Sequence, residues 1–243
     1  MTTPKMKVEV WTDIMCPYCY IGKIHYEKAL ARFEHAHEVE LIIKSFQLNP
    51  SLPDKGNGYP VIEYLTKTAG YPKRDIDQMF DNLKVLANNA GVKFNLQNSV
   101  AANTLDAHRL IKLAASQNIE SEVMTAISKA YFEDALDYSN IDILVKIGTK
   151  FGLAETTIRK MLDSDQYKDE VLKDIAEAHT LNIDTVPTFL FERKRAIIGS
   201  ESVDIFLTTL KKSHSEWKQS AANNGEIEIT KGKACPIDGV CEI

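Results

Sequence analysis

The 243-residue chain has few cysteines, no excess of positive charge and no long apolar run. Its net charge of −5 gives no reason to expect nucleic acid or an anionic membrane surface as a partner. No run approaches the roughly 18 apolar residues that a membrane-spanning helix needs. The first residues, MTTPKMKVEVWTD, alternate polar and apolar side chains almost at once and show no secretory signal. We therefore expect a cytoplasmic protein with no membrane and no nucleic acid as partner.

Internal repeats and low-complexity tracts are also missing from the sequence. Hydrophobic residues make up 44% and charged residues 26% of the chain, as in ordinary globular proteins. A chain of this length can bury its own core, as one domain or as one domain that carries an insertion. Structural disulfides are rare in the cytoplasm, so paired cysteines there indicate redox chemistry or metal binding.

Strand patterns occur only near the two ends of the chain. Residues 7–12 alternate polar and apolar side chains, and residues 39–46 are rich in β-branched and aromatic ones. A helical pattern over residues 17–33 joins them, which predicts a right-handed parallel βαβ unit. Residues 188–192 and 195–198 are two short apolar runs typical of an antiparallel hairpin, and an amphipathic helix follows them. Both ends need the same sheet to cover their apolar faces, so we expect one four-stranded sheet.

A helical block separates the two strand-forming ends. A loop rich in proline and glycine runs from residue 49 to residue 72. Beyond it, apolar residues recur at spacings of three and four for about a hundred residues, without a strand pattern. This division predicts a discontinuous sheet domain at 6–60 and 182–215, a helical insertion at 61–181 and a tail at 216–243.

Cys16 and Cys19 stand in the motif CPYC, where the strand pattern turns helical. Residues three apart at a helix start lie on the same face, close enough for a disulfide. Pro17 suits the first helical position, where no N–H is needed. Cys16 would then face the free N–H groups and the positive end of the helix dipole, which favour the thiolate. We expect Cys16 to ionise easily, with Pro17 and Tyr18 tuning the redox pair.

Two other interpretations of this motif are open. Both cysteines could be inert core residues, or they could form half of a zinc site. A zinc site needs two further ligands of suitable geometry. The second cysteine pair has five residues between its members, a poor match to zinc-knuckle spacing, and His35 and His37 in EHAHE fit a solvated helix end. We expect neither a metal nor an organic cofactor.

The residues CPYC and, at 185–188, TVPT resemble the motifs of the thioredoxin superfamily, and the helical insertion between them resembles its DsbA-like branch. The stretches VWTDIMCPYCYIG and NTLDAHRLIKLA are similar to the cytoplasmic FrnE-like group of DsbA-family oxidoreductases. Some members of that group are called polyketide-biosynthesis dithiol-disulfide isomerases. The likeness covers roughly residues 6–213. It implies an α/β protein with a DsbA-like thioredoxin fold, βαβ followed by ββα, interrupted by an all-helical insertion.

The resemblance also implies roles for particular residues. Cys16 would attack or be attacked, and Cys19 would resolve the mixed disulfide. Pro187 would follow a cis peptide bond beside these cysteines, with the backbone of Val186 pairing with an extended substrate segment. The implied partners are thiol- or disulfide-containing proteins or peptides, with a small-molecule or protein thiol as reductant. Tyr18 departs from the family, since DsbA has histidine and many FrnE-like relatives have tryptophan there, and the direction of electron flow stays open.

Cys235 and Cys241 form a second pair near the C-terminus, in ACPIDGVC. Pro236, Asp238 and Gly239 favour a turn, so a disulfide that closes this loop is sterically plausible. We expect such a bond to be exposed and therefore labile. Two hypotheses follow: the pair exchanges with Cys16 and Cys19 as a second redox pair, or it has no catalytic part.

Two alternative functions remain besides a thiol–disulfide oxidoreductase or isomerase. The same architecture resembles kappa-class glutathione transferases and 2-hydroxychromene-2-carboxylate isomerases, in which a serine replaces the first cysteine; Cys16 argues against that chemistry. A zinc-binding module through the four cysteines is the other alternative. His108, at helical spacing between Leu105 and Ile111, is interpreted as a packing or substrate-lining residue.

Overall fold

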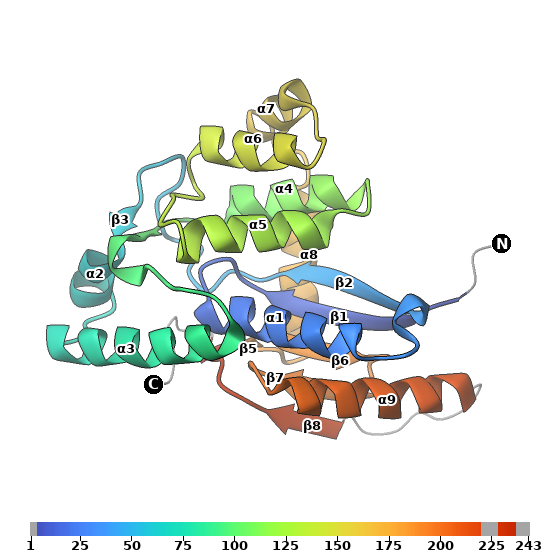
Figure 1. The fold of residues 1–243 in the computed structure, drawn as a ribbon. Coiled ribbons are helices and arrows are strands. Elements are labelled where there is room, and N and C mark those ends of the chain that lie inside the picture. The colour runs from blue at the N-terminus through green and yellow to red at the C-terminus, as the bar shows by residue number, and fades with distance from the viewer. Residues whose placement is uncertain (1–3, 220–227, 237–243) are drawn as a thin grey trace.

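The structure, a computed structural model, describes residues 4–219 and 228–236. At its centre is a five-stranded sheet with the strand order β2-β1-β6-β7-β8 (Figure 1). Its strands are β1 (Met6–Thr12), β2 (Val39–Ser45), β6 (Thr188–Phe191), β7 (Arg195–Ile198) and β8 (Glu228–Lys231). The sheet therefore joins the first 45 residues to the last part of the chain.

Strands β1 and β2 are parallel and are connected through helix α1 (Pro17–Ala31), as the sequence predicted. Strand β6 lies antiparallel to β1, with Val10 opposite Phe189, and antiparallel to β7. The hairpin between β6 and β7 turns at Glu192 and Arg193, which both have positive φ. The predicted βαβ unit and the predicted hairpin are both confirmed.

Strand β8 makes the sheet one strand wider than the four strands expected. It pairs in parallel with β7, from Arg195 opposite Glu228 to Ile198 opposite Lys231. Its one large apolar side chain, Ile229, is 55% exposed. The sequence does alternate isoleucine with polar residues there, in EIEIT at 226–230, but so short a stretch did not predict a strand, and the pairing with β7 reveals it.

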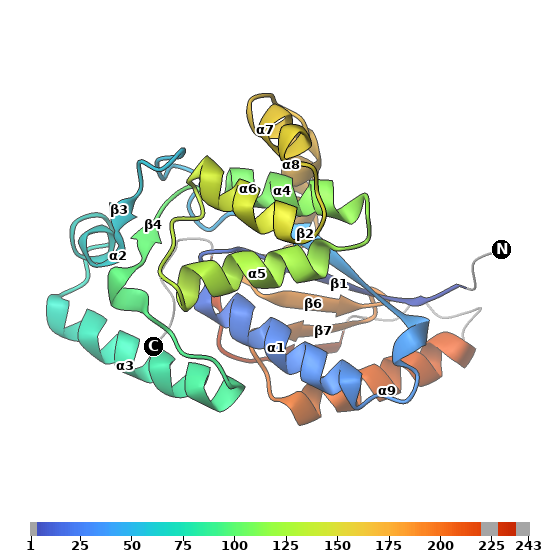
Figure 2. The ribbon, with the colours of Figure 1, turned by 45° about the horizontal axis from the view of Figure 1, so that its top comes forward.

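Helices cover both faces of the sheet (Figures 1 and 2). On one face, Tyr26 of α1 stacks on Phe189 of β6 with ring centroids 5.5 Å apart and meets Phe206 of α9 (Val203–Gln219) edge-on. On the other face, the indole Nε1 of Trp11 donates to the carbonyl of Asp174 in α8 (Lys168–Thr180) at 3.0 Å. Neighbouring side chains of a strand point to opposite faces, so Val10 and Trp11 pack against different helices.

The predicted helical block forms the second part of the molecule (Figure 2). Besides α8, its longer helices are α3 (Lys73–Ala90), α4 (Leu105–Ala115), α5 (Glu120–Phe132), α6 (Ile141–Lys150) and α7 (Glu155–Leu162). Helix α3 ends at Gly91, whose φ of 91° is the left-handed conformation that glycine adopts without strain. Helix α8 packs on α4 of the helical block and also on strand β2 of the sheet. The boundaries between the predicted domains therefore stay a prediction.

Short elements complete the described fold. The predicted loop at 49–72 contains helix α2 (Val61–Glu63) and a π-helical turn (Tyr64–Thr68). The others are η1 (Ala36–Glu38), η3 (Leu96–Asn98) and the two-residue strands β3 (Tyr59–Pro60), β4 (Val100–Ala101), β5 (Thr185–Val186) and β9 (Cys235–Pro236). Strand β3 pairs with β4, and β5 pairs with β9.

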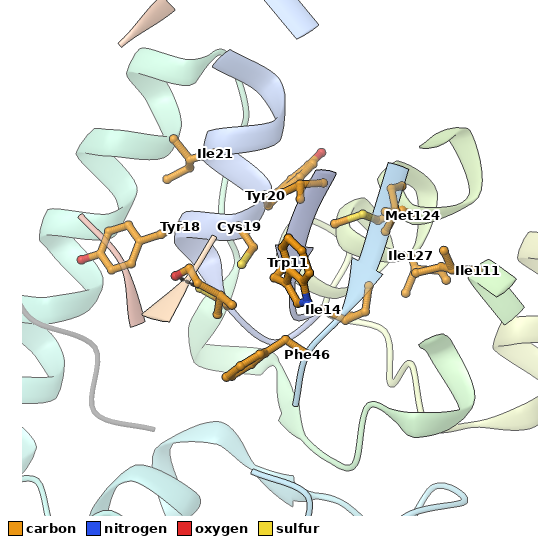
Figure 3. Packing of buried hydrophobic residues seen from close by; sticks show 14 of the residues in the cluster. Trp11, Ile14, Tyr18, Cys19, Tyr20, Ile21, Phe46, Ile111, Met124 and Ile127 are labelled. Atoms are coloured by element: carbon orange, nitrogen blue, oxygen red, sulfur yellow. Dashed lines mark hydrogen bonds between the residues drawn. The ribbon is translucent and has the colours of Figure 1, made fainter. Parts of the chain in front are cut away.

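One hydrophobic core runs from the sheet into the helical block. Figure 3 shows Trp11, Ile14 and Cys19 of the first part with Ile111, Met124 and Ile127 of α4 and α5. The start of α1 therefore lies where the sheet and the helical block meet. None of the helices in the described residues is both long enough and apolar enough to span a bilayer.

Candidate active site

Cys16 and Cys19 begin helix α1, as the sequence predicted. Cys16 is the N-cap residue with extended φ and ψ of −86° and 115°, and Pro17 occupies the first helical position. The backbone N–H of Cys19 donates to the carbonyl of Cys16 at 3.1 Å, which closes the first turn. Both cysteines are free thiols and are buried. The two sulfurs needed for a dithiol–disulfide couple thus share one turn.

Val186 and Pro187 lie against this turn. The peptide bond between them is cis, which confirms the conformation implied by the resemblance. The Cys16 thiol donates to the carbonyl of Val186 at 3.7 Å. On the other side, Pro187 packs so closely on α1 that a Cβ at Gly22 would lie 3.1 Å from its Cγ. The structure therefore brings together Cys16, Val186 and Pro187, and their role in binding substrate stays a prediction.

The thiol of Cys16 does not have the low pKa expected from its position at the helix start. Burial raises its pKa well above the usual value, and the hydrogen bond with the Cys19 side chain and the negative charge of Asp13 raise it further. The backbone N–H of Cys19 lowers the pKa, as a helix start should, but this effect is smaller than burial. The expectation that Cys16 ionises easily was therefore wrong for the chain as folded here, because Cys16 has no exposed surface.

Asp13 and His108 form a buried pair beside the two cysteines that sequence reasoning missed. The His108 Nε2 lies 3.2 Å from one carboxylate oxygen of Asp13, and the backbone N–H of Leu48 donates to the other at 2.7 Å. The backbone N–H of Asp13 donates to the Cys19 sulfur at 3.5 Å, and its carbonyl accepts from the N–H of Cys16. A carboxyl side chain three residues before CPYC, in the otherwise uncharged stretch VWTDIM, was the available signal.

Pro17 and Tyr18, the two residues between the cysteines, are both buried. In Figure 3, Tyr18 and Trp11 lie on opposite sides of Cys19. Their proposed effect on the redox couple stays a prediction.

An apolar pocket opens next to Cys16, between the start of α1 and the helical block. Its cavity volume is about 70 Å³. Met15 and Pro17, the two neighbours of Cys16 in the chain, line it together with Leu48, Tyr64, Phe80 and Tyr131. A pocket of this composition suits an apolar side chain that stands near a reacting sulfur.

Cys235 lies at this site and not on an exposed loop. Its strand β9 pairs antiparallel with β5, which places Cys235 opposite Val186. Its sulfur is 3.2 Å from that of Cys16, and the residue has no exposed surface. The expectation of an exposed disulfide was therefore wrong for Cys235, which is disulfide-bonded and buried. Cys241, the other member of the predicted pair, lies outside the described residues.

Cys235 does not offer a thiolate to the four-cysteine zinc module considered above. Zinc binds cysteine as the thiolate, and the sulfur of Cys235 is already part of a disulfide. The described residues do contain one group with ligand-type atoms close together, made of His35, Glu38 and His214. However, Lys218 donates to one Glu38 oxygen at 2.9 Å and His214 lies 2.5 Å from the other, so both carboxylate oxygens already have partners. We interpret this group as an ion-pair cluster that ties α9 to η1.

Comparisons with known proteins identify the family. A family model of the DsbA-like thioredoxin domain matches residues 7–211. The chain belongs to this family. A crystal structure of a probable DsbA oxidoreductase from Streptomyces coelicolor has a TM-score of 0.81 and 30% identity, and the match covers 98% of this chain and 99% of that one. The YwbO protein of Bacillus subtilis (strain 168) is 26% identical over 204 residues, which are 82% of this chain and 92% of that protein.

More distant structures share the fold of this DsbA-like chain. A 2-hydroxychromene-2-carboxylate isomerase has a TM-score of 0.67 and 12% identity, over 89% of this chain and 100% of that one. The cytosolic disulfide reductase DsbM from Pseudomonas aeruginosa has a TM-score of 0.57 and 13% identity, over 88% of this chain and 97% of that one. At this level of identity the likeness concerns the fold alone. The DsbA-like thioredoxin fold with its helical insertion, expected from the sequence, is confirmed.

Proposed function

We propose that this DsbA-like protein is a thiol–disulfide oxidoreductase or isomerase that acts on protein or peptide substrates through Cys16 and Cys19. The observation that carries the proposal is the pair of free thiols on the first turn of α1, beside the backbone of Val186. The 2-hydroxychromene-2-carboxylate isomerase chemistry has no comparable support, because Cys16 stands where those enzymes have serine. We also propose a cytoplasmic location, with which the fold likeness to a cytosolic disulfide reductase is consistent.

The proposed reaction is thiol–disulfide exchange in two steps. The Cys16 thiolate attacks one sulfur of a substrate disulfide, whose other sulfur leaves as a thiolate. The Cys19 thiolate then attacks the sulfur of Cys16, which releases the second substrate thiolate and leaves a Cys16–Cys19 disulfide. The substrate gains two electrons and the enzyme loses two, which a small-molecule or protein thiol restores. In isomerisation the released substrate thiolate attacks another disulfide of the substrate, the thiolate freed there attacks the Cys16–substrate disulfide, and Cys16 leaves as a thiolate with no net transfer of electrons.

The second pair takes part in the same exchange. The Cys16 thiolate attacks the sulfur of Cys235, the disulfide of Cys235 breaks, and its partner leaves as a thiolate. Attack by Cys19 on Cys16 then releases Cys235. Two electrons pass from the CPYC pair to the tail. The 3.2 Å separation of the Cys16 and Cys235 sulfurs supports this step. We propose Cys241 as that partner.

Trapping of the mixed disulfide tests the catalytic pair. The protein should accelerate the reduction of insulin by dithiothreitol and the reactivation of scrambled ribonuclease. Both accelerations should be lost in Cys16→Ser. In Cys19→Ser, a mixed disulfide between Cys16 and the substrate should accumulate, because the resolving thiol is missing. A double Cys235→Ser, Cys241→Ser variant should retain the reaction with external substrates and lose only exchange with the tail. Full activity of Cys16→Ser would refute the proposal.

A further inference from the structure

Residues 228–236 follow an unbroken path from the edge of the sheet to the catalytic cysteine. Strand β8 first pairs with β7. The N–H of Gly232 then donates to the carbonyl of Ile198, and the N–H of Ser200 donates to the carbonyl of Lys233 at 2.8 Å. Strand β9 follows directly and pairs with β5. Backbone hydrogen bonds therefore hold this segment along its length.

The chain passes very close to itself where Gly199, after β7, meets Gly232, between β8 and β9. Gly199 has a φ of 94°, and a Cβ at this residue would lie 2.6 Å from the carbonyl oxygen of Gly232. No side chain fits there, and the backbone conformation itself favours glycine. The close approach of residues 199 and 232 directs the chain from β8 toward the cysteines.

At the end of this path, β9 occupies the edge of β5, where an extended peptide ligand would pair with Val186. The backbone of Val186 pairs with Cys235, and the carbonyl of the same residue accepts from the Cys16 thiol. Ala234 is 8% exposed, and Cys235 and Cys16 have no exposed surface. Substrate segments that bind at a sheet edge add a strand through the same backbone groups. Val186 cannot pair with β9 and with another strand at once.

We propose that residues 234–236 are a resident, substrate-like strand, and that an external substrate reaches Cys16 only by displacing it. This inference rests on the proposed function and specifies its substrate. The displacing segment is an extended polypeptide that carries a cysteine opposite Val186, runs antiparallel to β5 and has a small residue before that cysteine, as Ala234 is here. The burial that raises the pKa of Cys16 belongs to the state with the strand in place.

The test compares three forms of the reduced protein by the rate at which iodoacetamide alkylates Cys16, resolved by peptide mass spectrometry. One form is the full chain. The second ends at Lys233, so it keeps β8 and loses β9. The third carries Cys235→Ser and Cys241→Ser, so it keeps the backbone pairing and loses the sulfurs. If the strand covers Cys16 for about nine-tenths of the time or more, the shortened chain should react at least about tenfold faster, and the double variant should stay slow.

A full-length variant guards against misfolding of the shortened chain. Ala234→Glu places a charge at a buried position and should expel β9, with the same acceleration. In insulin reduction, both forms that lack the seated strand should show a lower KM than the full chain. A synthetic peptide of residues 230–243 with both cysteines replaced by serine should inhibit the shortened chain competitively.

The results separate this inference from the proposed function. Equal alkylation rates and equal KM values in all forms, with insulin reduction intact, would overturn the resident strand and leave the enzyme assignment standing. Faster alkylation in the double serine variant would also overturn it, because the cover would then depend on the Cys235 and Cys241 sulfurs and not on the backbone pairing. Absence of insulin reduction and of ribonuclease reactivation in every form would overturn the proposed function itself.

Discussion

Replacing Asp13 by asparagine should change the stability of the protein and the acidity of Cys16 in opposite senses. Both Asp13 and His108 are buried, with 1% and 0% of their surface exposed. The carboxylate accepts two hydrogen bonds, from the Nε2 of His108 and from the N–H of Leu48. Among the described residues, the Nδ1 of His108 has no hydrogen-bond partner, so we assign the ring proton to Nε2.

The loss of stability follows from counting donors. An asparagine offers one oxygen and one NH₂ group where the carboxylate offered two oxygens. Either one buried N–H group then faces the amide NH₂, or His108 moves its proton to Nδ1, where it has no acceptor. In each case one buried donor is left unsatisfied, which costs about 1–3 kcal/mol. Urea unfolding should show this loss through a lower midpoint with an unchanged slope.

The acidity of Cys16 should rise in the same variant. The negative charge of Asp13 contributes to the raised pKa of Cys16, so removing the charge should lower that pKa. The pH dependence of Cys16 alkylation, resolved by peptide mass spectrometry, measures the change. Asp77→Asn, on the exposed surface of α3, is the matched control and should change neither quantity. An unchanged free energy of unfolding, or a Cys16 pKa that stays the same or rises, would refute the reasoning.

Two further predictions concern the joins between the parts of the fold. Asp174→Ala should lower the free energy of unfolding by about 3 kcal/mol, because the buried N–H of Ser45 loses its acceptor at 2.8 Å and Lys112 loses an ion-pair partner. Exposed Lys173→Ala on the same helix is the control, and an equal, small effect of both changes in urea unfolding would contradict the assignment. The hydrogen bonds from Lys218 and His214 lower the pKa of Glu38 to about 2, below the value of roughly 4.3 in the unfolded chain. The ionised Glu38 side chain should therefore stabilise the fold above pH 4.3, and this stabilisation should vanish as the pH falls toward 2. The difference in Tm between the parent protein and Glu38→Gln should therefore shrink over that range, and a difference independent of pH would show that the ion pair is not responsible.

The predicted elements that were confirmed share a strong local signal. Residues 7–12 alternate polar and apolar side chains, residues 39–46 are rich in β-branched ones, and the short run of β6 is buried at every residue. The helices of the insertion show spacings of three and four, and Gly91 ends α3 where the pattern stops. Local pattern sufficed in these cases because each element buries its own apolar face.

Elements that bury little apolar surface could not be predicted in this way. Strand β8 has an exposed isoleucine, and strands β3, β4, β5 and β9 have only two residues each. Their stability comes from backbone pairing with residues far along the chain. Two-residue strands are too short to show a period, and the short alternation EIEIT at 226–230 is the one trace of β8.

The candidate site also has features that local sequence predicts and features that depend on contacts between distant residues. The sequence by itself determined the two cysteines on one helical turn and the thioredoxin-like order of strands and helices, because spacing and hydrophobic period act over a few residues. Tertiary structure decided what surrounds the Cys16 sulfur: the buried Asp13–His108 pair, the carbonyl of Val186 and the sulfur of Cys235. A thiol's acidity depends on its solvation and on charges within a few ångströms. Here the surroundings of the Cys16 sulfur are supplied by residues 170 and 219 positions away as well as by its neighbours in the chain.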